Sequence, residues 1–188
     1  MIFPENYKKL KFPSVKSEAF ELVPIRYEDR NPIMKWRNEQ IYHLRQAAPL
    51  TQENQDTYFR EVVSKIFTKE TPEQLLFSLL ENNRLIAYGG LVHINWTDKN
   101  AEISFVMDTA LENERFSELW SEYLSLIKKV AFEDLLLHKI YVYAFDLRPH
   151  LYAMLEENNF TREAVLKEHC YFENQFIDVV IYSFIKNS

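Results

Sequence analysis

The spacing of apolar residues changes several times along the chain, and each spacing predicts a type of secondary structure. Short alternating or continuous apolar runs that end at polar turns predict strands. Seven segments have this pattern, at residues 20–25, 75–80, 84–94, 101–107, 139–145, 163–172 and 176–185. Polar turns at 81–83 and 95–100 separate the second, third and fourth segments. These three segments are therefore predicted to form an antiparallel meander.

Apolar residues three or four positions apart predict four helices between these strands. The first covers residues 30–40, and Pro32 suits its first turn. Thr51 fits the N-cap position of the second helix. The third is the longest, with an apolar stripe over residues 116–130, and the last covers residues 150–158.

The order of these elements defines a fold class. The order is one strand, two helices, three strands, then helix, strand, helix and two strands. This order predicts an α+β domain. A meander followed by a strand–helix–strand crossover predicts a central mixed sheet of about seven strands with helices on both faces. No internal repeat or linker divides the sequence. We therefore expect one domain over residues 1–188, with residues 1–18 as an extended lead-in.

Composition restricts the classes of function. Apolar residues make up 47% of the chain and charged residues 27%, as in globular proteins. The net charge of −6 argues against nucleic-acid binding, and the basic residues Lys8, Lys9 and Lys11 are interpreted as a solvated tail. Without a long apolar run or a signal pattern, we expect a cytoplasmic protein with no membrane contact. The single cysteine, Cys170, cannot form an internal disulfide, and no Cys/His spacing indicates a metal site.

Four short segments, taken in order, are similar to the motifs of one enzyme family. Residues 101–108 form a strand in which a glutamate precedes alternating apolar residues, and residues 152–160 resemble a late helix that ends in Leu-Gly-Phe. Asn159 replaces that glycine, and asparagine is the next best residue at a left-handed helix end. With residues 36–38 and 173–178, these segments make the chain resemble the GNAT N-acetyltransferases. The resemblance is greatest to the subgroup of ribosomal-protein N-terminal and amino-sugar acetyltransferases.

The resemblance implies that acetyl-CoA is the co-substrate and binds where two neighbouring parallel strands separate. Its pantetheine arm then pairs with the backbone of Phe105, Val106 and Met107. In the family, a loop with glycines brings backbone N–H groups close to the pyrophosphate. The only glycines of this chain, Gly89 and Gly90, lie elsewhere. They indicate a bulge or a close backbone approach in their own strand.

The segment aligned with the pyrophosphate loop, residues 112–117, supplies the remaining cofactor-binding candidates: Asn113, Arg115, Phe116 and Ser117. Arg115 replaces a glycine but offers a bidentate phosphate contact, and Ser117 is small enough for the last loop position. Two acidic side chains in the segment repel phosphate by about 1 kcal/mol each if exposed. Two alternatives follow, namely weakened or rearranged CoA binding and lost CoA binding.

The resemblance also implies catalytic residues. Glu102 matches a glutamate that some members use as general base, and burial raises the pKa of such a carboxyl. The alternative is a strand glutamate in an ordinary ion pair. Leu155 replaces the family's general-acid tyrosine, so Tyr152 becomes the candidate acid, with simple packing as its alternative. Arg148 replaces an asparagine that the family has after the preceding strand.

Candidates for the acceptor site are Trp36, Arg37 and His93, with His43 and Arg45 in the same variable helical region. The predicted function is transfer of an acetyl group from acetyl-CoA to a primary amine. The acceptor is a small molecule, such as an amino-sugar nucleotide, or a protein N-terminus. The alternative is a catalytically silent GNAT-like domain that binds a small molecule or a protein. Aromatic residues in the closing hairpin suggest a homodimer.

Overall fold

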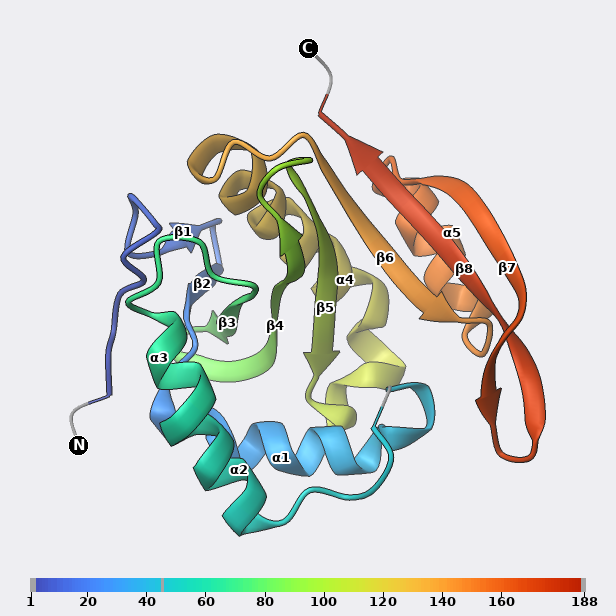
Figure 1. Cartoon of the computed structure of the whole chain (residues 1–188), viewed down its shortest axis with the longest axis horizontal. Helices are drawn as coiled ribbons and strands as arrows, with labels where there is room; N and C mark the ends of the chain where they lie inside the picture. Colours follow the sequence, from blue (N-terminus) through green and yellow to red (C-terminus); the bar gives the residue numbers. More distant parts are fainter. Residues whose placement is uncertain (1–2, 45, 187–188) are drawn as a thin grey trace.

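The computed structural model of the chain describes residues 3–44 and 46–186 (Figure 1). Its centre is an eight-stranded sheet in the order β1-β2-β3-β4-β5-β6-β8-β7. The strands are β1 (Val15–Lys16), β2 (Phe20–Pro24), β3 (Leu75–Glu81), β4 (Arg84–Asn95), β5 (Asn100–Met107), β6 (Lys139–Phe145), β7 (Thr161–Phe172) and β8 (Gln175–Ile185). Strands β5 and β6 are parallel, and the other neighbours pair antiparallel. The predicted mixed sheet is confirmed, with β1 as an additional strand.

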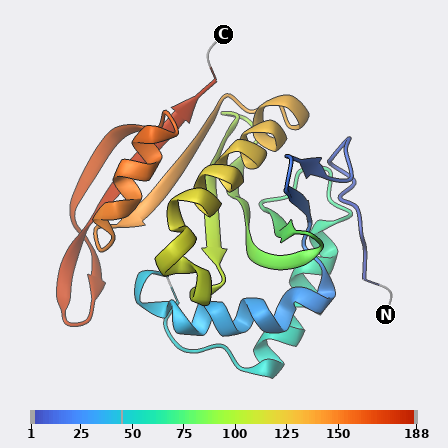
Figure 2. The ribbon, with the colours of Figure 1, turned by 180° about the vertical axis from the view of Figure 1, so that it is seen from behind.

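Helices cover both faces of this sheet. They are α1 (Arg30–Glu39), α2 (Gln52–Tyr58), α3 (Ser64–Ile66), α4 (Thr109–Lys129) and α5 (Pro149–Glu157). One face is covered by α4 and α5 (Figure 2), while α2 and α3 lie over β3 on the other face (Figure 1). A π-helical turn at Phe59–Val63 joins α2 to α3, and another at Val130–Asp134 extends α4. None of the helices in the described part of the chain is long and apolar enough to cross a membrane.

Helix α4 begins earlier than the sequence predicts. The carboxylate of Asp108 accepts a hydrogen bond from the Ala110 N–H at 3.1 Å and caps the helix, which therefore starts at Thr109. Residues 112–117, expected as a loop, are consequently helical. Arg115 alone departs from helical geometry, with φ −123° and ψ 15°, and marks a kink between two helical parts.

The glycine pair in β4 marks a close approach between backbones. A Cβ on Gly89 would overlap the carbonyl of Ser104 on β5, and a Cβ on Gly90 would overlap the carbonyl of Leu75 on β3. The missing side chain at Gly89 also leaves room for the Tyr123 hydroxyl, which donates to the Ser104 carbonyl at 2.8 Å. The register irregularities lie elsewhere, between Leu79 and Leu80 of β3 in its pairing with β4 and between Val92 and Asn95 of β4 in its pairing with β5, so the predicted bulge is not at the glycines.

The basic lead-in is packed against the domain and is not a free tail, although the side chains of Lys8 and Lys11 are exposed, as the interpretation of a solvated segment expects. Tyr7 is buried, and its hydroxyl donates to the Leu76 carbonyl at 2.8 Å and accepts from the Leu76 N–H at 3.1 Å. Lys8 forms an ion pair with a glutamate, and the Lys9 ammonium lies 4.4 Å from the centroid of the Trp96 ring. The tail is held because Tyr7 bonds to the edge of β3.

Helix α5 ends in a left-handed residue, as the sequence predicts. Asn159 has φ 64°. The N–H of Phe160 donates to the carbonyl of Leu155, and the N–H of Asn159 donates to that of Glu156, both at 2.9 Å. These two bonds form a Schellman motif, in which glycine is the best residue at the left-handed position.

Substitutions at Asn159 test this motif. Asn159→Gly is expected to stabilise the protein by about 0.5–1 kcal/mol, because glycine has no Cβ penalty at positive φ, and Asn159→Ala is expected to destabilise it by about 1 kcal/mol. For a chain of this size, 1 kcal/mol corresponds to a shift of about 2–4 °C in Tm. Thermal unfolding of the three proteins measures the effect. A lower Tm for Asn159→Gly than for Asn159→Ala would contradict the assignment.

Candidate functional site

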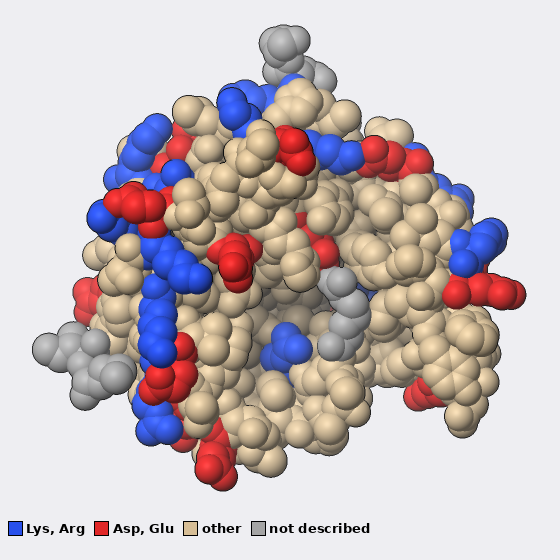
Figure 3. All heavy atoms as spheres, in the orientation of Figure 1, with Lys and Arg blue, Asp and Glu red and all other residues tan. Residues whose placement is uncertain are grey.

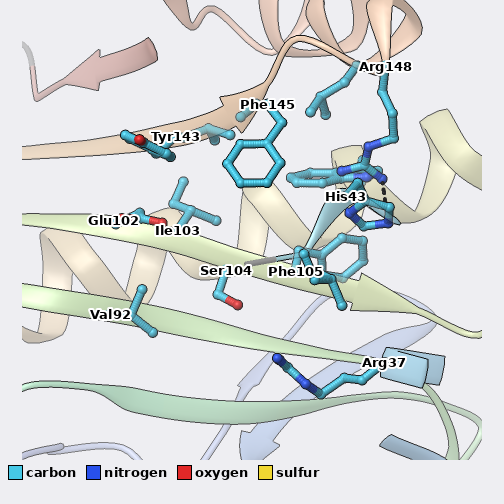
Figure 4. A pocket seen from close by; sticks show the side chains of 15 residues that line it. Arg37, His43, Val92, Glu102, Ile103, Ser104, Phe105, Tyr143, Phe145 and Arg148 are labelled. Carbon is cyan, nitrogen blue, oxygen red and sulfur yellow. Dashed lines mark hydrogen bonds between the residues drawn. The ribbon is translucent and has the colours of Figure 1, made fainter. Parts of the chain in front are cut away.

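The parallel strands β5 and β6 separate along their length and open a cleft (Figure 4). They pair at Asn100–Lys139, Ala101–Ile140 and Glu102–Tyr141, whereas β6 pairs with β8 along its whole length. The cleft is lined by residues of β4, β5, β6, α4, the start of α5 and the region of α1: Arg37, His43, Leu44, Val92, Glu102, Ile103, Ser104, Phe105, Trp120, Val142, Tyr143, Ala144, Phe145, Arg148 and Leu151. The separation of the two strands is the feature that the family resemblance implies.

Glu102 lies where the strands begin to separate. It is the last residue of β5 that pairs with β6, and its side chain is buried. Its Oε2 is 3.9 Å from Nε2 of His93, whose side chain is 66% exposed. His93 has φ 49° within the irregular part of β4, which turns its side chain towards Glu102. The structure therefore brings these two candidates together.

The segment expected to pair with pantetheine follows Glu102 directly. Phe105 faces α4, where its ring stacks on Tyr123 at 4.2 Å between centroids and meets Trp120 edge-on at 4.7 Å. Val106 and Met107 are buried, and the Met107 carbonyl accepts a hydrogen bond of 2.8 Å from the side-chain amide of Gln40. Phe105 thus anchors β5 to α4, and residues 103–107 of β5 have no partner on β6.

The structure does not bring Arg115 to the cleft. Its guanidinium forms ion pairs with Glu81 at 2.7 Å and with Glu118 at 2.6 Å. Hydrogen bonding to these carboxylates raises the pKa of Arg115, whose charge they neutralise. Asn113 and Ser117 are exposed on α4 and do not line the cleft.

Phe116, the remaining loop candidate, lies beside a different arginine. Its ring contacts His150 edge-on at 4.5 Å between centroids, and the guanidinium carbon of Arg148 lies 6.0 Å from its centroid. Arg148 lines the cleft and is 13% exposed. Its Nη1 is 3.3 Å from Nε2 of His43 and 3.7 Å from Oε1 of Glu112. The cleft therefore has Arg148 beside Phe116 in addition to Arg37, and the sequence identifies Arg148 only as a replacement for asparagine.

His43 is neutral in this arrangement. Burial, followed by the positive charge of Arg148, lowers the pKa of His43 from 6.5 to about 3. Nε2 of His43 lies 3.3 Å from both Nη1 of Arg148 and Oε1 of Gln40. It accepts from the arginine in one tautomer of the neutral imidazole and donates to the amide oxygen in the other. A neutral His43 thus orients Arg148 in the cleft.

The depressed pKa of His43 predicts a dependence of stability on pH. As pH falls below 6.5, the unfolded chain binds the proton before the folded chain does, so stability is lost between pH 6.5 and about 3. His43→Gln removes this proton uptake and is expected to lose less Tm than wild type between about pH 7 and about pH 5. Thermal unfolding across that range provides the measurement. Equal losses in both proteins would show that His43 is not held neutral.

Two further candidates lie away from the cleft. Trp36 is 4% exposed and packs in the core, because it shares the apolar face of α1 with Ile33. The Tyr152 hydroxyl donates to Oδ1 of Asp146 at 2.7 Å, and its ring stacks on Tyr182. Burial and this bond raise the pKa of Tyr152. It is the preceding residue of α5, Leu151, that lines the cleft.

A second pocket adjoins the cleft. It lies between α1–α2 and β3–β4, and the two spaces share Arg37, Val92 and Ser104. The face shown in Figure 3 is hollowed near its centre, and most charged side chains lie around the hollow rather than within it. Arg37 points towards Val92 and Ser104 (Figure 4). Arg45 lies outside the described residues.

Several lining residues were not identified from the sequence, notably Ser104, Tyr143 and Phe145. Ser104 is two positions after Glu102 on the same face of β5, so the strand period could have indicated it. Tyr143 and Phe145 of β6 read as ordinary strand aromatics in the sequence. Only the separation of β5 from β6 shows that they line a cleft.

Comparisons with known proteins agree with this geometry. The sequence profile described as "Acetyltransferase (GNAT) domain" matches residues 22–181. The spermidine N-acetyltransferase from Vibrio cholerae in complex with CoA and spermine has a TM-score of 0.75 at 18% identity, over 90% of this chain and 96% of that chain. A putative acetyltransferase has a TM-score of 0.68 at 16% identity, over 98% of this chain and 88% of that chain. No curated protein sequence matches the chain.

The profile covers most of the sequence, and the chain therefore belongs to the GNAT acetyltransferase family. It is an acyltransferase, and the acetyltransferases of this family use acetyl-CoA as co-substrate. At 16–18% identity, the solved structures support the fold and nothing finer.

Proposed function

We propose that the chain transfers an acetyl group from acetyl-CoA to a primary amine, with the β5–β6 cleft as the cofactor site. The observation that carries the proposal is the position of Glu102, a buried carboxyl at the point where the two strands separate. Glu102 lines the cleft, and Val92, its pairing partner on β4, lines both the cleft and the second pocket. A proton acceptor there is close to both substrates.

The cleft suits the arm of CoA. Residues 103–107 of β5 present a strand edge that β6 does not pair, and an extended chain of amides can bond to such an edge. Val142, Ala144 and Leu151 supply apolar walls for its methylene groups. For the phosphates we propose Arg148 in place of a glycine loop, because Arg148 faces the cleft and Arg115 is held by two carboxylates.

When bound, acetyl-CoA supplies a thioester: the new amide bond forms as the C–S bond breaks, and CoA leaves as a thiolate that takes up a proton to become the thiol. Glu102 accepts the proton that the amine loses, and His93, at 3.9 Å, stabilises the carboxylate in its charged form if protonated. Glu102 pairs with Val92 on β4 and with Tyr141 on β6, and these two pairings fix its backbone at the cleft. The protein otherwise contributes orientation, by holding the amine against the thioester.

The alternative function, a silent GNAT-like binding module, has its own supporting observations. The segment 112–117 is helical without a glycine, and the Tyr152 hydroxyl is bonded to Asp146. Both features differ from what a standard CoA site requires. An acetyltransferase consumes the thioester of acetyl-CoA, whereas a silent binding module does not.

For the acceptor, we propose a small amine, such as an amino-sugar nucleotide, or a protein N-terminus. The similar structure from Vibrio cholerae is a complex with CoA and spermine, so polyamines belong in the same assay. The purified protein is incubated with acetyl-CoA and a panel of these amines, and acetylated product and released thiol are measured together. Formation of both in equal amounts supports acetyl transfer. Absence of product from every class of amine, with thiol release no faster than without protein, favours the silent module.

We also propose a homodimer formed through the β7–β8 hairpin. Tyr171 and Phe176, near its tip, are 65% and 64% exposed, and their rings contact each other at 5.1 Å. Exposed aromatic pairs of this kind are common in interfaces. One similar solved structure, of the Vibrio cholerae spermidine N-acetyltransferase, is described as dodecameric.

A further inference from the structure

The second pocket has a chemical character that restricts its ligand. None of the described residues that line it is an aspartate or a glutamate. Its walls are apolar or neutral, with Tyr58 and Phe59 from the helical side and Leu76 from β3. The one charged group in the described lining is the guanidinium of Arg37.

Arg37 is bonded only to neutral groups among the described residues. Its Nη1 donates to the Tyr88 hydroxyl at 2.7 Å, and its Nε donates to Oε1 of Gln46 at 2.9 Å. Burial raises the pKa of Tyr88, so that hydroxyl stays neutral. A guanidinium has five N–H donors, and Nη2 makes no hydrogen bond within the described chain. The two bonds fix the planar group while leaving donors for a ligand.

Such a pocket disfavours a polyamine and favours an anion. A second cation beside a half-buried guanidinium meets like-charge repulsion that no carboxylate of the described lining offsets. A carboxylate or a phosphate can instead accept two parallel N–H bonds from arginine. The chain as a whole carries a charge of −6, so the positive charge is a property of this pocket and not of the surface in general.

We propose that the second pocket takes an amine that also carries an anionic group, a carboxylate or a phosphate, which Arg37 binds. The proposal rests on the acetyl-transfer function proposed above. The amine of such a ligand faces Ser104 and Val92, where the pocket joins the cleft, and its uncharged part lies along Tyr58 and Phe59.

Matched pairs of amines test the proposal. The pairs are tyrosine and tyramine, 4-aminobutyrate and butylamine, and glucosamine 6-phosphate and glucosamine, with spermidine as a further cation. Binding of each to the CoA-saturated protein is measured by calorimetry, and acetylation is measured where it occurs. The anionic member of at least one pair is expected to bind about 10–100 times more tightly, the range for a charge-assisted bond. The carboxylate and phosphate pairs distinguish the two sources of the anion.

Variants assign the effect to Arg37. Arg37→Gln is expected to abolish the preference within the pair, through KM or Kd rather than kcat, and Arg37→Lys to keep part of it. Arg60→Gln removes an exposed arginine of the same helical region outside the pocket and serves as the control. An unchanged circular-dichroism spectrum and cooperative thermal unfolding of Arg37→Gln show that the variant is folded.

Three results would overturn the proposal: tighter binding of spermidine or of the members without the anionic group, no difference within any pair, or an equal loss of kcat for both members of a pair in Arg37→Gln. The last result would assign Arg37 to the reaction itself. If the wild-type protein did not bind acetyl-CoA, that result would instead contradict the acetyl-transfer function. The two failures are therefore distinguishable.

Discussion

Glu102→Gln is expected to lower kcat by about 100-fold or more, the contribution typical of a positioned general base. Glutamine keeps the shape of the side chain and its place on β5 but cannot accept a proton. Because the carboxyl is buried at the point where β5 and β6 separate, no other carboxylate of the described cleft can replace it. Steady-state kinetics with an accepted amine measure the effect, while calorimetry is expected to show nearly unchanged acetyl-CoA affinity.

The pH profile separates a base from a structural residue. At alkaline pH the amine is already neutral in solution, so the defect of Glu102→Gln is expected to shrink as pH rises. Glu163→Gln is the matched control, since Glu163 is also a strand glutamate but pairs with Lys139 outside the cleft. Unchanged kcat in Glu102→Gln, or a defect equal to that of Glu163→Gln, would exclude Glu102 as the base.

Gly90→Ala is expected to destabilise the protein by about 3 kcal/mol, the upper end of the usual cost of overpacking. The added Cβ would overlap the carbonyl of Leu75, which belongs to the neighbouring strand and cannot rotate away. Relief requires β3 and β4 to move apart. For this chain length, the change corresponds to a loss of about 6–12 °C in Tm.

Thermal unfolding of Gly90→Ala measures this cost. Ala164→Val is the control, because it enlarges a half-buried side chain in β7, the last strand of the sheet, and its expected effect is within about 0.5 kcal/mol. A Tm for Gly90→Ala within about 2 °C of wild type would contradict the close approach of β3 and β4.

The fold was predictable from sequence because its elements are long and regularly patterned. The meander of β3, β4 and β5 follows from apolar alternation and short polar turns. The Schellman end at Asn159 follows from the tolerance of asparagine for left-handed geometry. Each of these signals depends on residues close together in the chain.

The site was less predictable because its contacts join distant residues. Arg115 is held by Glu81, which lies 34 positions away on β3, and no local spacing reveals that partner. Arg37 bonds to Tyr88, 51 positions away, and only the assembled sheet makes it part of a pocket. The N-cap at Asp108 is a local signal that the sequence contains. The family pattern led us to expect a loop at 112–117 instead, so the earlier start of α4 was not predicted.

The central claim is that the cleft between β5 and β6 binds acetyl-CoA without a glycine loop. Thermal unfolding of the wild-type protein with and without millimolar acetyl-CoA tests it most directly. A ligand at 100 times its Kd adds about 2.7 kcal/mol, which for this chain corresponds to a rise of about 5–10 °C in Tm. We predict a rise of that order, reduced in Arg148→Gln. No change in the Tm of the wild-type protein at millimolar acetyl-CoA would contradict the claim.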